Sequence, residues 1–189
     1  MRIIGGQYRS RVLAPIRGEG IRPTSDRVKE SLFGILSPRL YGARVLDLFC
    51  GSGALGLESL SRGAKEAVFN DCSKESLEVL KKNLRLLKLE ARTYCLDYMQ
   101  CLDTLYGKFD IIFLDPPYSE DLGVRAMGRI AEKKLLREGG VIVYERDRSF
   151  GEDMPDCRLQ KTDERKYGKT WLSFFSLCQG TGTAAEERR

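Results

Sequence analysis

The tetrapeptide Asp115-Pro116-Pro117-Tyr118 combines residue types that could hold a planar amino group for a reaction. It directly follows the apolar run Phe109–Leu114, and its two prolines impose a rigid, non-helical backbone there. The Asp115 carboxylate and the Pro116 carbonyl oxygen can accept hydrogen bonds from an NH2 group, which draws the nitrogen lone pair out of conjugation. The Tyr118 ring offers a face on which a nucleic-acid base can stack. The pattern predicts chemistry on an exocyclic amine of a base.

A second group of residues predicts a nucleotide site. Gly51 and Gly53 lie between a predicted strand and a predicted helix, where a backbone without side chains can approach a ligand. Asp71 lies 20 residues after Gly51, a spacing typical of a carboxylate that accepts hydrogen bonds from ribose hydroxyls. Asp97 follows the next predicted strand, where it could accept from an adenine amino group. A helix N-cap is an equally good interpretation of Asp97, and the two roles can coexist.

Asp47 indicates which nucleotide binds. A carboxylate beside the glycines would repel a pyrophosphate, whereas it suits the positively charged amino-acid end of S-adenosylmethionine. The chain has no histidine, which excludes imidazole acid–base chemistry and a histidine-based zinc site, and we expect no metal. A sulfonium methyl group is already activated, so positioning of the amine and proton acceptance suffice. We therefore expect S-adenosylmethionine as the cofactor.

Alternating strand and helix patterns provide the scaffold for both groups of residues. We expect a parallel sheet of the Rossmann-like α/β class, in which all strands present their carboxyl ends at one edge. A preceding helix is capped by Thr24 or Ser25 and is expected to stop at Pro38. The predicted core strands are 44–49, 67–70, 92–96, 109–114 and 141–145. The predicted core helices include 54–62, 98–106, 122–136 and a long helix capped by Ser73. Gly139-Gly140 is predicted to form a turn, and 158–166 and 170–177 are predicted to form a closing hairpin.

Positive charge is concentrated near the start of the chain. The net charge is +5, but residues 1–44 contain nine Lys and Arg against three acidic residues, a net of +6. This segment is expected to form two short strands, 2–5 and 11–13, as an appendage outside the core. We expect it to contact a polyanion, although an ordinary basic surface would have the same composition. The predicted organisation is an extension at 1–43, a cofactor-binding core at 44–178 and a disordered tail at 179–189.

Length and hydropathy limit the remaining function classes. A chain of 189 residues supports one well-buried core. No apolar run approaches the roughly 20 residues of a membrane-spanning helix, and the start lacks the apolar stretch of a signal peptide. We therefore expect a cytoplasmic protein that binds no membrane, with its six cysteines as free thiols.

Three motifs together resemble a known family. Residues 2–11, 22–30 and 47–58 are similar to the bacterial 16S ribosomal RNA guanine-N2 methyltransferases called RsmD, and the resemblance extends over residues 1–178. It implies a seven-strand class I S-adenosylmethionine-dependent methyltransferase fold with an N-terminal β-hairpin extension. It also implies methylation of one guanine of 16S rRNA within a small-subunit particle. By matching motif, the resemblance implies that the donor is bound by Asp47, Gly51, Gly53 and Asp71. It implies that the target amine is held by Asp115, Pro116, Pro117 and Tyr118, and that the donor or the substrate contacts Arg22, Thr24 and Arg27. We expect Arg9 and Arg11 to contact RNA.

Other functions remain open at this stage. The same tetrapeptide would serve an adenine-N6 methyltransferase acting on DNA or RNA, although no additional target-recognition domain is evident. A non-catalytic RNA-binding assembly factor would need only the basic N-terminal segment. A nicotinamide dehydrogenase is disfavoured by Asp47, and a tritiated-methyl assay on RNA, DNA and ribosomal particles would separate the remaining possibilities.

Overall fold

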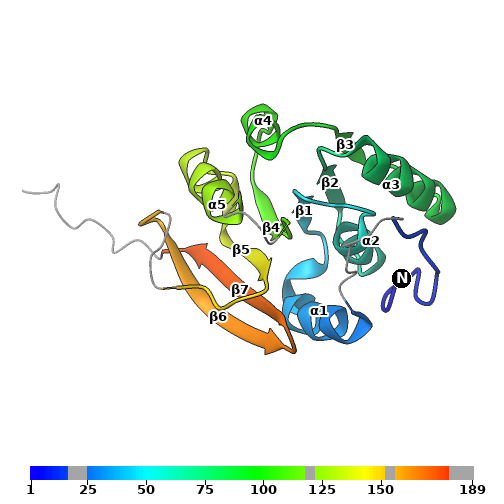
Figure 1. The fold of residues 1–189 in the computed structure, drawn as a ribbon, viewed down its shortest axis with the longest axis horizontal. Helices are drawn as coiled ribbons and strands as arrows, with labels where there is room; N and C mark the ends of the chain where they lie inside the picture. The colour runs from blue at the N-terminus through cyan, green and yellow to red at the C-terminus, as the bar shows by residue number, and fades with distance from the viewer. Residues whose placement is uncertain (17–24, 118–121, 152–155, 179–189) are drawn as a thin grey trace, which may run out of the picture.

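The computed structural model describes residues 1–16, 25–117, 122–151 and 156–178, which are coloured in Figure 1. Within these residues seven strands form one sheet in the order β3-β2-β1-β4-β5-β7-β6. Strands β1 to β5 are parallel to their neighbours, and β7 pairs antiparallel with both β5 and β6. The elements are α1 (Asp26–Leu40), β1 (Arg44–Asp47), α2 (Ala54–Ser61), β2 (Glu66–Asn70), α3 (Lys74–Leu87), β3 (Arg92–Tyr94), α4 (Tyr98–Thr104), β4 (Phe109–Leu114), α5 (Leu122–Glu132), β5 (Leu136–Arg146), β6 (Leu159–Tyr167) and β7 (Thr170–Leu177).

Helices cover both faces of this sheet, as expected for the predicted α/β class. Side chains alternate between the two faces along each strand, so Ile111 and Phe113 of β4 pack with α1, α2 and α3, whereas Ile112 and Leu114 pack with α4 and α5. Figure 1 shows α4 and α5 on one side of the sheet and α1 and α2 on the other. Because both faces are buried, β4 is apolar along nearly its whole length.

Helix α1 begins where the sequence predicts and ends later. The Ser25 hydroxyl caps the helix by accepting a hydrogen bond from the Val28 N–H at 3.3 Å. The expected stop at Pro38 is wrong, because the helix continues to Leu40. Pro38 leaves only the Gly34 carbonyl without an amide partner, and Gly34 is exposed, so water can satisfy that carbonyl.

The boundary between α5 and β5 also differs from the prediction. Helix α5 ends at Glu132 rather than at residue 136, because Lys134 adopts φ +54° and the Leu135 N–H bonds back to the Ile130 carbonyl. Helices more often end in this way with glycine, so the sequence gives no warning of the stop. Strand β5 begins at Leu136 instead of 141, and the predicted Gly139-Gly140 turn lies within it, where the register with β4 is irregular.

The N-terminal segment, residues 1–16, is tightly joined to the core. Its antiparallel pairing is present but short, with a single bridge between Arg2 and Val12 in place of two full strands. Ile3 and Leu13 are fully buried and belong to the same apolar cluster as α1, α2 and α3. The expectation of an appendage outside the core is therefore wrong, since this segment completes the core on that face.

Buried polar side chains hold the N-terminal segment in place. The Glu58 carboxylate of α2 accepts hydrogen bonds from the backbone N–H groups of Ile4 and Gly5 at 2.9 and 2.8 Å. The Asn83 side chain of α3 accepts from the Ala14 N–H at 2.7 Å and donates to the Ala14 carbonyl at 3.2 Å. The Lys29 ammonium of α1 donates to the Arg2 carbonyl at 2.5 Å. These contacts position the segment against three helices.

Among the described helices, none has the length and apolar character to cross a membrane.

Candidate active site

Four carboxylate side chains lie at the carboxyl edge of the sheet. Asp47 ends β1, Asp71 follows β2, Asp115 follows β4 and Glu145 lies near the end of β5. These strands are parallel, so their carboxyl ends meet at one edge, where open α/β sheets bind ligands. The geometry therefore brings together the nucleotide and amine constellations that the sequence predicts separately.

The glycine loop, residues 50–53, turns the chain from β1 into α2. Gly51 and Gly53 adopt φ +52° and +85°, which residues with a Cβ adopt only with strain. A side chain on Gly53 would also lie 2.4 Å from Leu80, so both glycines are required by the local geometry. Ile16 of the N-terminal segment lies 3.4 Å from the position of a Cβ on Gly51. The loop thus lies beside the N-terminal segment, with Gly51 its one partly exposed residue.

Asp71 braces this loop. Its Oδ2 accepts a hydrogen bond from the Gly51 N–H at 2.8 Å, and its Oδ1 accepts from the Ser73 N–H at 2.8 Å. Each carboxylate oxygen retains a second lone pair, so these bonds leave capacity for ribose hydroxyls. The 20-residue spacing from Gly51 reflects a direct contact between the two residues.

Asp47 is almost fully buried, at 2% exposure, and accepts a hydrogen bond from the Gly56 N–H at 2.9 Å. Burial and, to a smaller extent, the negative charge of Asp71 raise the pKa of Asp47, while the Gly56 N–H lowers it, and together they bring it to about 7. A nearby positive charge would stabilise the ionised form of such a buried carboxyl group with a raised pKa. The site therefore fits the ammonium end of S-adenosylmethionine.

The other polar groups around the loop also fit a nucleoside. The Asn70 amide nitrogen donates to the Leu48 and Leu96 carbonyls at 3.1 and 3.2 Å, and among the described residues its buried Oδ1 has no hydrogen-bond partner. Asp97 caps α4 by accepting from the Met99 N–H at 2.8 Å, which confirms the N-cap interpretation. Asp97 is exposed, so its carboxylate also remains accessible to a ligand.

Asp115 and Glu145 lie side by side at the ends of two paired strands. Leu114 pairs in register with Tyr144, so the residues that follow them occupy adjacent positions on the same face of the sheet. Burial raises the pKa of Asp115 well above its usual range, and the negative charges of Glu145 and Asp47 raise it further. Pro116 is buried and Pro117 is exposed, which places a rigid turn directly after the carboxylate.

Sequence reasoning missed Glu145 as a member of this site. A usable signal existed, because the predicted strand 141–145 ends in a carboxylate at the same edge as Asp47 and Asp115. Glu145 was not considered because it belongs to no recognised motif.

The predicted substrate residues fall into two groups. Arg9 and Arg11 are exposed on the N-terminal segment, and Arg27 is exposed in the first turn of α1. Arg22, Thr24 and Tyr118 lie outside the described residues. Among the residues that the structure does describe, no group of three or more His, Cys, Asp or Glu could hold a metal ion.

The comparison with protein families accounts for nearly the whole chain. Residues 1–176 match the family described as Conserved hypothetical protein 95. The chain belongs to this family. YlbH of Bacillus subtilis is 38% identical to this chain over 182 residues, which cover 93% of this chain and 98% of YlbH.

Further comparisons agree with this assignment. Ribosomal RNA small subunit methyltransferase D of Haemophilus influenzae is 39% identical over 153 residues, covering 78% of this chain and 79% of that protein. The solved structure of yhhF from Escherichia coli has a TM-score of 0.84 and 34% identity, and the match covers 94% of this chain and 97% of that chain. These matches confirm the family resemblance that the sequence motifs indicated. They also confirm the predicted seven-strand α/β fold of this protein.

Proposed function

We propose that this protein transfers the methyl group of S-adenosylmethionine to the exocyclic N2 amine of a guanine in 16S rRNA, within a small-subunit particle in the cytoplasm. The observation that carries the proposal is the arrangement at the carboxyl edge, where the Asp115 turn and the Asp47 and Asp71 carboxylates around the glycine loop lie together. The names of the relatives in Haemophilus influenzae and Escherichia coli, ribosomal RNA small subunit methyltransferase D, support the choice of substrate.

Each residue has a defined role in this proposal. Asp47 offers a negative charge to the ammonium end of the donor, the backbone at Gly51 and Gly53 allows close approach, and Asp71 accepts from the ribose hydroxyls. When bound, S-adenosylmethionine supplies an activated methyl group. Asp97 accepts from the adenine amino group.

The amine is held on the other side of the donor site. The Asp115 carboxylate and the Pro116 carbonyl accept hydrogen bonds from the target NH2 group and align its lone pair, and Tyr118 stacks on the base. The proton lost from nitrogen needs an acceptor nearby, and an ionised Asp115 with its raised pKa suits this role. No metal or imidazole takes part in these steps.

The test is methylation of small-subunit particles from a bacterial strain that lacks this gene, with tritiated S-adenosylmethionine and mapping of the modified nucleotide. We expect N2-methylguanine in 16S rRNA. Asp115→Asn should bind the donor normally and lose at least about 10²-fold in single-turnover rate, because the neutral amide keeps one acceptor oxygen but can neither accept the proton nor supply the negative charge. The exposed residue Asp147 provides a matched control, and Asp147→Asn should retain full activity.

The alternatives predict different products. N6-methyladenine in RNA or DNA would show the adenine specificity instead. Absence of donor binding by the wild-type protein would indicate the non-catalytic assembly factor. Near-normal turnover by Asp115→Asn would remove Asp115 from the mechanism.

A further inference from the structure

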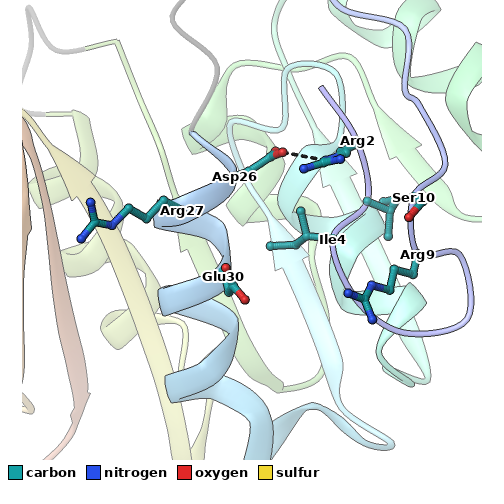
Figure 2. Close-up of a pocket in the computed structure, with 8 residues that line it drawn as sticks. Arg2, Ile4, Arg9, Ser10, Asp26, Arg27 and Glu30 are labelled. Carbon is teal, nitrogen blue, oxygen red and sulfur yellow. Dashed lines mark hydrogen bonds and ion pairs between the residues drawn. The ribbon is translucent and has the colours of Figure 1, made fainter.

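A cavity of about 260 Å³ lies between the N-terminal segment and the first turns of α1. Figure 2 shows the side chains around it, which come from these two segments. The residues that line it are Arg2, Ile3, Ile4, Arg9, Ser10, Asp26, Arg27 and Glu30. None of them belongs to the glycine loop or to the Asp115 turn, so the cavity is separate from the candidate active site.

The cavity nevertheless lies toward the same edge of the sheet. Only residues 41–43 join the end of α1 to the start of β1, so the C-terminal end of α1 lies at the opposite edge. Phe33, near the middle of α1, packs on Phe113, near the carboxyl end of β4, with ring centroids 6.0 Å apart, so the middle of the helix already lies close to that end of the strand. The first turn of α1 therefore points toward the carboxyl edge.

Two opposite charges face this cavity without partners. Arg2 is neutralised by Asp26 through an Nε–Oδ2 contact of 2.8 Å. Arg9 and Glu30 are both exposed, and across the described part of the chain their side chains form no hydrogen bond or ion pair. Figure 2 shows them on opposite walls, Arg9 from the N-terminal segment and Glu30 from α1, while the Arg27 side chain points away from the cavity.

This arrangement discriminates between ligand chemistries. A phosphate alone would suit Arg9 but would be repelled by Glu30. Guanine presents two adjacent donors, N1–H and the N2 amine, on one edge and two acceptors, O6 and N7, on another. A carboxylate and a guanidinium on opposite walls match these two edges, and the partly buried Ile4 side chain offers an apolar surface for the ring.

We propose that this cavity binds a second, unpaired guanine nucleotide of the RNA substrate, with Glu30 accepting from N1–H and N2 and Arg9 donating to O6 and N7. The inference rests on the proposed function in that it takes RNA as the ligand. Bases of single-stranded RNA are available for recognition on these edges. The cavity would thus set the register of the strand relative to Asp115, by holding one nucleotide near the target.

The test is fluorescence anisotropy, without methyl donor, on short labelled oligouridylates that contain one central guanosine or one central adenosine. The wild-type protein should prefer the guanosine probe by about tenfold, the order expected for one bidentate base contact. Glu30→Gln and Glu30→Ala should both reduce this preference strongly, and Arg9→Gln should weaken binding and reduce it as well. Glu138→Gln and Arg39→Gln, both at exposed positions, are the matched controls and should keep the preference.

A purely electrostatic role for Glu30 predicts the opposite result. Removing a negative charge near a polyanion should then raise the affinity for both probes equally, with the guanosine preference unchanged, and that outcome would overturn the proposal. So would a wild-type protein without preference. Thermal unfolding of each variant checks that the fold is intact. Methylation of small-subunit particles is measured separately, so a wild-type protein that reads guanosine but does not methylate would contradict the proposed function and leave the cavity assignment standing.

Discussion

Asp47 and Asp115 show how the environment of one side-chain type sets its role. Asp47 ends one central parallel strand and Asp115 follows another, and burial raises the pKa of each. Asp47 accepts a backbone hydrogen bond inside the glycine-loop turn, whereas Asp115 faces Glu145. Asp47 therefore suits a ligand with a fixed positive charge. Asp115 suits an uncharged amine that must lose a proton.

The raised pKa of Asp47 predicts proton release when the donor binds. With a pKa of about 7, Asp47 is partly protonated at neutral pH in the free protein. An ammonium group beside it favours the anion, so donor binding should release a fraction of a proton at neutral pH, and less as the pH rises above the free-state pKa. Calorimetry of S-adenosylmethionine binding in buffers of different ionisation enthalpy measures this number. Asp47→Asn should abolish the release, and Asp147→Asn should preserve it.

Glu145 should control the acidic limb of the pH–rate profile. Asp115 can accept a proton only when it is ionised, so turnover should rise as the pH passes upward through its pKa. Glu145→Gln removes one of the charges that raise this pKa, and the acidic limb should therefore move to lower pH. Single-turnover methylation as a function of pH checks the direction. An unshifted profile with a uniformly lower rate would mean that Glu145 has only a structural role.

At the scale of elements, the N-terminal segment combines a buried side and an exposed side. Ile3 and Leu13 complete the core, whereas Arg9 and Arg11 extend into solvent. The two sides can therefore be tested by separate substitutions. Stability should depend on the buried contacts, and affinity for RNA on the exposed arginines.

Neutralising Arg9 and Arg11 together to Gln should weaken RNA binding without altering the fold. Loss of the Arg11 phosphate contact should reduce the slope of log affinity against log salt by roughly 0.7 to 0.9, and loss of the Arg9 contact to guanine should lower the affinity further. Donor affinity and the thermal midpoint should stay unchanged, because both side chains are exposed. Lys82→Gln with Arg85→Gln, on the exposed side of α3, is the matched control. An unchanged salt slope in the Arg9/Arg11 variant would mean that the basic segment does not contact phosphates.

Glu58 should determine how firmly the N-terminal segment is held. Its carboxylate lies 3.8 Å from the Lys29 ammonium, and both side chains are fully buried. Burial lowers the pKa of Lys29, and the charge of Glu58 opposes that effect. Glu58→Gln would leave a buried ammonium without its counter-charge, which should lower the free energy of unfolding by about 3 kcal/mol.

Urea denaturation measures this loss, and a double-mutant cycle with Lys29→Met isolates the pair. The double variant should be less destabilised than the sum of the single variants, because no uncompensated buried charge remains. Strict additivity would show that the two residues act independently. Glu78→Gln, which breaks an exposed pair with Lys81, should have no measurable effect.

For the whole molecule, local sequence patterns predict the sheet, whereas the contacts that fix the N-terminal segment depend on residues far apart in the chain. The apolar run of β4 and the leucines of α3 indicate their elements directly, and the strand ends then place Asp47, Asp71 and Asp115 together. Glu58 and Asn83 would be assigned to an ordinary helix surface, because their partners in the N-terminal segment lie 53 to 69 positions away. No local pattern indicates those contacts. The cavity beside α1 was missed for the same reason.

The anchoring contacts also set the order in which the molecule can be assembled. Residues 1–14 leave a translating ribosome before α2 and α3 do, yet the bonds from Ile4 to Glu58, from Tyr8 to Ser61 and from Ala14 to Asn83 can form only after these helices have emerged. Contacts between such distant positions form late because the intervening chain must first be ordered. The arginine-bearing segment is therefore synthesised early and fixed late. A nascent chain that ends before α3 would contain the arginines of the RNA-binding surface without the arrangement that we assign to it.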